Sequence, residues 1–150
     1  MKISKILAAV SVAALVAGAA GMASAQDAAA IQKQRSDLMK SNGASMGKIV
    51  PVVRGQAEFS PAAVEAAEQL AKNAKALQTL WGPGTDLPND QAKPEIWTNK
   101  ADFDAKLAAF LTNTEALAAA AKLGKDQMLA AFQPVGGACG GCHGTYRVPQ

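Results

Sequence analysis

The C-terminal segment carries the side chains best suited to chemistry. Cys139, Cys142 and His143 include both cysteines and the only histidine of the 150-residue chain. On an α-helix, residues three and four apart share one face, so two thiols and one imidazole would lie together. Each thiol can add to one vinyl group at the edge of a porphyrin, and the imidazole can reach the iron. The pattern C-x-x-C-H is typical of c-type haem attachment and predicts one covalently bound haem c per chain.

Three other uses of these residues have less support. A disulfide between Cys139 and Cys142 is possible in an oxidising compartment, but it would close a very small loop and leave His143 unexplained. Structural zinc takes four protein ligands, and the chain has no further Cys or His to offer. A thioredoxin-like redox pair needs a βαβ context, which the sequence does not provide.

The N-terminal segment predicts export. Lys2 and Lys5 precede a short apolar run, and the sequence ASA at 23–25 offers a small-x-small cleavage site. This order is typical of a secretory signal peptide. Residues 1–25 are therefore interpreted as a signal peptide that is removed, and 26–150 as one domain located in the periplasm. The apolar run is diluted by Gly and Ser and lacks a cationic stop, so we expect no membrane helix after signal removal.

The charge balance excludes several classes of function. Without residues 1–25 the chain has 13 Lys and Arg against 12 Asp and Glu, a formal charge of +1. The basic residues are scattered and aromatic residues are few, so nucleic-acid binding is not expected. No group of residues combines a general acid, a base and a nucleophile, so we do not expect an enzyme.

Four segments repeat apolar residues at steps of three and four, which is typical of helices with one face toward a core. The first is expected to end at Pro51. Ser60 and Pro61 predict an N-cap and a first helical position for the second. The third is expected to begin near positions 98–99 and to end at Gly124. The positions expected to face the core include Ile31, Leu38, Met39, Met46, Ile49, Val64, Ala67, Ala71, Ala74, Leu77, Phe103, Leu107, Phe110, Leu117, Ala121, Met128, Phe132, Val135 and Tyr146.

The links between these segments predict the topology. Short links join the first helix to the second and the third to the fourth, whereas a long Gly- and Pro-rich connection at 81–97 joins the second to the third. We therefore expect an all-α fold, an antiparallel up-and-down four-helix bundle with haem attached near the C-terminus. The fourth helix, from about Asp126, should be a poor helix by itself, because it contains Pro134 and five glycines.

Few residues could occupy the face of the iron opposite His143. Only seven residues follow His143, and the chain has no second histidine. Met128 precedes His143 by 15 residues on the same predicted helix, about 22 Å at 1.5 Å per residue, and is out of reach. Met39 and Met46 on the first helix remain as candidates.

Several motifs carry a family resemblance over essentially all of residues 26–150. They are Arg35 with Met39 four positions on, IVPVVRGQA at 49–57, WGPGT at 81–85, KPEIW at 93–97 and CGGCHGTYR at 139–147. With these motifs the sequence resembles the class II c-type cytochromes, and most closely the cytochrome c′ family. Pro134 and the Gly-Gly pair between the cysteines depart from the family pattern.

The resemblance implies a function and a distal residue. It implies that His143 is the axial ligand of a five-coordinate, high-spin iron that binds NO and CO and can transfer one electron, with nitric oxide buffering as a possible role. Met39 would either block the opposite face or ligate the iron, as in low-spin relatives of the c-556 kind that act as electron carriers, or do neither. Met46 is expected in the core. Stable oxygen carriage is not expected, because a distal pocket without a hydrogen-bond donor offers nothing to polarise dioxygen.

The resemblance also implies roles for residues around the cofactor. Arg35 would approach a haem propionate, the alternative being an ordinary solvated charge. Ser36 and Gln91 would line the haem edge. Arg147 would lie on the proximal side of the haem, the alternative being an ordinary surface arginine. Family members often pair through their first two helices, so we expect a homodimer, with a redox partner that the sequence does not identify. Packing residues around the cofactor would be Trp81, Trp97 and Tyr146.

Overall fold

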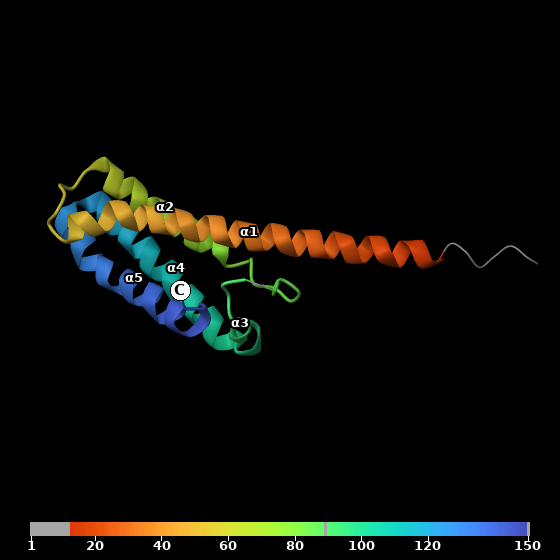
Figure 1. The fold of residues 1–150 in the computed structure, drawn as a ribbon. Helices are drawn as coiled ribbons and strands as arrows, with labels where there is room; N and C mark the ends of the chain where they lie inside the picture. Colours follow the sequence, from red (N-terminus) through yellow and green to blue (C-terminus); the bar gives the residue numbers. More distant parts are fainter. Residues whose placement is uncertain (1–12, 89, 150) are drawn as a thin grey trace, which may run out of the picture.

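The computed structural model describes residues 13–88 and 90–149, with side chains from Asp27 onward. Four long helices run alternately in opposite directions through the described chain (Figure 1), which confirms the predicted all-α up-and-down four-helix bundle. A short fifth helix, which the sequence pattern did not predict, interrupts the long connection. The helices are α1 (Ala13–Val53), α2 (Pro61–Leu77), α3 (Glu95–Thr98), α4 (Lys100–Leu123) and α5 (Lys125–Tyr146).

Helix α1 ends slightly later than the sequence predicted. Pro51 lies inside the helix, which continues to Val53. A proline this close to the end removes only the hydrogen bond to the carbonyl of Gly47, so the last turn survives. The chain leaves the helix at Gly55, whose φ of +69° is a conformation that glycine adopts easily. Glycine geometry, and not proline, therefore ends α1.

The predicted boundaries of the other helices are confirmed to within about two residues. Ser60 is the N-cap of α2 in extended conformation, with Pro61 at the first helical position, although the Ser60 side chain makes no capping hydrogen bond. Gly124, with φ of +131°, separates α4 from α5. Because a side chain at this φ would be strained, Gly124 is the residue that allows the tight reversal between the two helices.

Helix α5 is continuous, in spite of Pro134 and its glycines. It packs extensively on α4, and Val135 and Tyr146 on its inner face are fully buried or nearly so. The Asn113 amide on α4 donates a hydrogen bond to the Pro134 carbonyl at 3.2 Å. Tertiary packing therefore supplies the stability that the helix propensity of this segment lacks.

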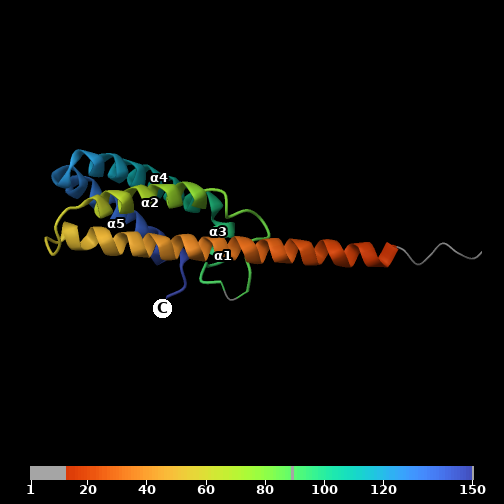
Figure 2. The same cartoon turned by 90° about the horizontal axis from the view of Figure 1, so that it is seen from above.

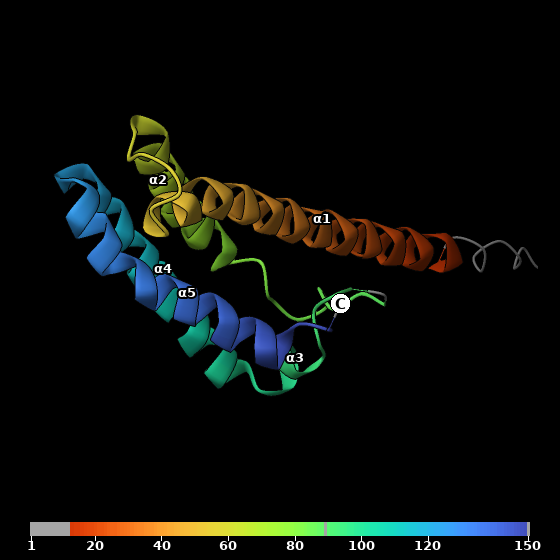
Figure 3. The same cartoon turned by 60° about the vertical axis from the view of Figure 1, so that its left-hand side comes forward.

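The bundle is closed on three sides. Helix α1 packs on α2, α2 on α4 and α4 on α5, whereas α1 and α5 make little direct contact in the described chain. Figure 3 shows α1 diverging from the α4–α5 pair toward its N-terminus. The core between these layers contains several alanines and Leu70 from α2, together with larger side chains from the other helices, among them Ile49, Leu107, Leu117 and Met128.

The predicted signal peptide, residues 1–25, is only partly covered by the structure. Residues 1–12 lie outside the described residues, and 13–25 continue as the first turns of α1, which project beyond the other helices (Figures 1 and 2). None of the helices between residues 13 and 149 that the structure describes combines the length and apolar character needed to cross a membrane.

Candidate functional site

The last turns of α5 present the three residues predicted to hold a cofactor. Cys139, Cys142 and His143 lie in unbroken helix, so their spacing places them on one face. Both thiols are free and half-buried, and both pack against the hydrophobic core. His143 is exposed. The structure therefore brings these three side chains together as the sequence predicted.

The environment of this face sets the protonation of each group. Burial raises the pKa of the Cys139 and Cys142 thiols above their usual value, so both stay protonated at neutral pH. Although His143 is exposed as a residue, its imidazole is partly covered, and this desolvation, with a smaller contribution from the positive charge of Arg147, lowers the pKa of His143. Its imidazole is therefore neutral near pH 7 and keeps a lone pair available for a metal ion.

Helix α1 lies across the bundle from these residues. Met39 on α1 is half-buried and touches the core without being enclosed by it. Helices α1 and α5 make little direct contact, and several apolar side chains on the two helices are only partly buried against the core. These side chains are Leu38, Met39 and Met46 on α1 and Phe132, Cys139 and Cys142 on α5.

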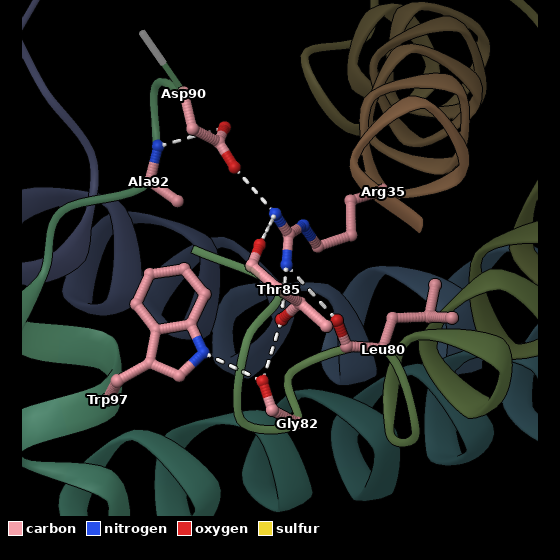
Figure 4. Close-up of polar contacts among 7 residues, drawn as sticks. All are labelled: Arg35, Leu80, Gly82, Thr85, Asp90, Ala92 and Trp97. Atoms are coloured by element: carbon pink, nitrogen blue, oxygen red, sulfur yellow. Dashed lines mark hydrogen bonds and ion pairs between the residues drawn. The ribbon is translucent and has the colours of Figure 1, made fainter. Parts of the chain in front are cut away.

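A buried arginine joins α1 to the long connection after α2 (Figure 4). Arg35 is 3% exposed. Its Nη1 donates to the Leu80 carbonyl and to Thr85 Oγ1, both at 3.1 Å. Its Nη2 donates to the Thr85 carbonyl at 2.8 Å and pairs with Asp90 Oδ2 at 2.6 Å. Arg35 is therefore not a solvated surface charge, since protein oxygens surround its guanidinium group.

Aromatic rings surround the same guanidinium group. Its central carbon lies 4.6 Å from the ring centroid of Trp81 and 5.6 Å from that of Trp97, distances at which cation–π attraction operates. The Trp97 indole donates to the Gly82 carbonyl at 3.0 Å. Trp81 also packs edge-on against Phe103 on α4 at 4.9 Å. Both tryptophans therefore pack around Arg35, and their place around a cofactor stays a prediction.

The connection is also tied to the chain after the cysteine motif. Ala92 forms an isolated antiparallel bridge with Arg147, and the Lys93 amide donates to the Tyr146 carbonyl at 2.9 Å. The Arg147 guanidinium donates to Gln91 Oε1 at 3.3 Å. Gln91 and Arg147, two predicted site residues, are therefore in contact, whereas Ser36 is exposed on α1 and joins none of these contacts.

Sequence reasoning missed two residues of the arginine cluster, Thr85 and Asp90. Both lie in a connection without hydrophobic periodicity, so no pattern linked them to Arg35. It also missed Asn42, whose amide lies 3.8 Å from the Met39 sulfur. Here a signal was available, because a spacing of three residues on a helix predicts contact.

The described residues fit a haem in three respects. The α5 face offers two thiols and a neutral imidazole in the order that covalent attachment needs. A large flat apolar group between α1 and α5 would cover apolar side chains that are only partly buried on these two helices. The indole nitrogen of Trp81, beside Arg35, is a buried donor without a hydrogen-bond partner, which is rare in folded proteins and suits an acidic substituent of the cofactor.

Comparison with known proteins gives concordant results. The sequence profile described as "Cytochrome C'" matches residues 29–147. The chain is 39% identical over 124 residues to cytochrome c′ of Alcaligenes xylosoxydans xylosoxydans, covering 81% of this chain and 94% of that one. It is 35% identical over 149 residues to cytochrome c-556 of Agrobacterium fabrum, covering 99% and 97%. The family resemblance inferred from the sequence is confirmed.

A solved structure with a similar fold carries a ligand. It is a ferrous variant of cytochrome c prime from Alcaligenes xylosoxidans with bound NO, 34% identical in sequence, with a TM-score of 0.72. The alignment covers 80% of this chain and 94% of that chain. The similarity thus extends over nearly the whole length of the relative.

We predict that the Arg35–Asp90 pair stabilises the fold. Removing one partner of a buried ion pair costs roughly 3–5 kcal/mol, and we expect about 3 kcal/mol for Asp90→Ala because the Leu80 and Thr85 oxygens remain. Denaturant unfolding measures the loss. Asp37→Ala is the matched control, because Asp37 pairs with Lys33 on the exposed surface and should cost less than about 1 kcal/mol. Equal losses in the two variants would contradict the prediction.

We also predict a pH-dependent contribution from Tyr146, the only tyrosine of the chain. Burial, assisted by its 2.5 Å hydrogen bond to Asp102, raises the pKa of Tyr146 to about 12. In the unfolded chain the tyrosine hydroxyl has a pKa of about 10. Above that pH the unfolded chain releases this proton while the folded protein keeps it. The contribution of Tyr146 to stability is therefore complete below pH 10 and is lost as the pH rises to about 12. Urea unfolding should show wild type losing stability relative to Tyr146→Phe in this window. Parallel pH curves for the two proteins would disprove it.

Proposed function

Because the chain belongs to the cytochrome c′ family, we propose that it is a periplasmic haem protein that binds NO or CO at a five-coordinate, high-spin iron and can also transfer one electron. Members of the family carry covalently bound haem c, and Cys139 and Cys142 provide the two thiols for it. When bound, the haem supplies a redox-active iron with a coordination position for a small ligand. The observation that carries the proposal is the His143 imidazole on the same helix face as the two half-buried thiols.

Four residues of this chain would have separate roles around the cofactor. Cys139 and Cys142 would hold the porphyrin edge on α5, and His143 would bind the iron. Met39 would cover the other side from α1, where an apolar side chain would admit small uncharged molecules and exclude larger ones. The bound NO in the similar solved structure supports this choice of ligand.

Arg35 and Arg147 would act at the edges of the site. The haem propionate is expected near Arg35, where the unpaired Trp81 indole nitrogen offers a second donor. Four protein oxygens already accept hydrogen bonds from Arg35. Arg35 would therefore attract the propionate through its positive charge more than through a new hydrogen bond. Arg147, held by Gln91, would lie on the proximal side. Ser36 is exposed and would contribute least.

The alternative is a dedicated electron carrier with Met39 on the iron. Relatives named cytochrome c-556 from several bacteria match the chain, and the Met39 side chain is half-buried on the helix facing α5. In both cases the protein would exchange electrons with a partner and would not act as an enzyme. The two functions differ in a single coordination bond.

An optical spectrum of the ferrous protein separates the two functions. We expect a high-spin spectrum that shifts when CO is added, because Met39 covers the iron without binding it. Met39→Leu should keep that spin state, since leucine is also apolar, and Met39→Ala should raise the CO association rate by about tenfold or more, equivalent to about 1.4 kcal/mol of barrier. The electron carrier would be supported instead if the wild-type spectrum is low-spin, does not change when CO is added, and becomes high-spin in Met39→Leu.

Native mass spectrometry of the exported protein tests processing and assembly together. We expect a mature chain that begins at Gln26, carries one covalent haem and pairs as a homodimer. The family profile begins at residue 29, just after the proposed cleavage site, and the segment of α1 before it projects from the bundle (Figure 1). Retention of residues 1–25, a mass without haem or a purely monomeric ion would each contradict one part of this prediction.

A further inference from the structure

A chain of buried and half-buried amides links α2 to Met39. Gln69 Nε2 on α2 donates to Asn73 Oδ1 at 2.7 Å, and Asn73 Nδ2 donates to Asn42 Oδ1 on α1 at 2.9 Å. Asn42 Nδ2 then donates to the Met39 sulfur at 3.8 Å. Asn42 is 8% exposed and Asn73 2%, so neither amide is well placed to exchange these partners for water.

The direction of this chain is set at its Met39 end. A thioether sulfur accepts a hydrogen bond weakly and cannot donate one, so Asn42 turns its NH₂ group toward Met39 and its oxygen toward Asn73. The Asn73 NH₂ group donates to that oxygen and also to Ser41 Oγ at 2.9 Å. Amides that donate in sequence also polarise one another, which strengthens the last contact.

We propose that Asn42 is a positioning residue that holds the Met39 side chain over the distal side of the haem and so limits the rate at which a small ligand reaches the iron. This inference rests on the proposed function, in which Met39 blocks that side without binding the iron. To admit a ligand, Met39 must swing aside and break its contact with Asn42. The Asn42 NH₂ group is then left buried without a partner, a cost that adds to the barrier.

The test is the CO association rate of the ferrous haem protein with and without the amide. Asn42→Leu keeps a similar side-chain volume and removes the donor, and Asn73 keeps its bond to Ser41. We expect CO association to become about fivefold faster, in keeping with the loss of one hydrogen bond. In a Met39→Leu background the same change should alter the rate by less than about twofold, because no sulfur is left to hold.

Two further variants separate positioning from a general loosening of the fold. Ser41→Ala removes the other acceptor of Asn73 without touching Met39, and should leave the CO rate unchanged. Asn73→Leu removes the hydrogen bond that orients the Asn42 amide. It should increase the CO association rate, by less than Asn42→Leu does. It also serves as the test if Asn42→Leu fails to fold. Methionine methyl NMR of the CO-bound protein should show greater mobility of Met39 in Asn42→Leu and no change at Met128.

The outcomes distinguish this inference from the proposed function. A high-spin wild type that binds CO at the same rate as Asn42→Leu, or at the same rate as Asn73→Leu if only that variant folds, overturns the inference alone. Acceleration of equal size in the Met39→Leu background overturns it too, since the effect would then not pass through Met39. A low-spin wild type that takes up no CO overturns both.

Discussion

The packing of α5 on α4 is the constraint on which the rest of the site depends. Two thiols and an imidazole share one face only while residues 139–143 stay helical, and this glycine-rich segment has little helix propensity of its own. The buried side chains of Val135 and Tyr146 hold it against α4. Gly124 allows the reversal that brings the two helices together. The chemistry of the motif is therefore supported by contacts that lie outside the motif.

Arg35 provides a second organising contact at the other edge of the site. Its buried guanidinium group connects α1 with Leu80, Thr85 and Asp90. The same connection is joined through Ala92 to Arg147, just after the cysteine motif. Three segments that are distant in sequence are thus linked one to the next through this connection, while α1 and α5 make little direct contact with each other. The small bundle therefore combines a tightly bonded region around Arg35 with a side, between α1 and α5, where helices do not pack closely.

Much of the fold followed from the sequence because helical periodicity is a local property. The four long helices, the Ser60–Pro61 start and the Gly124 reversal were all predicted. The end of α1 differed because a proline in the last turn disrupts only one hydrogen bond, and Gly55 decides where the chain turns. Helix α3 was missed because a single turn of helix leaves no periodic pattern. The site was predictable where spacing along one helix sets the geometry, as for Cys139, Cys142 and His143.

By itself the sequence determined which chemistry is available, since the only histidine and both cysteines stand at helical spacing, and the family to which they point. Only the tertiary structure decided how the remaining groups are used. It buried Arg35 among protein oxygens, placed Asp90 against it and turned the Asn42 amide toward Met39. Those arrangements depend on loops and on contacts between helices. Spacing along a chain carries no information about which distant segments meet, because burial and hydrogen bonding between elements select those contacts.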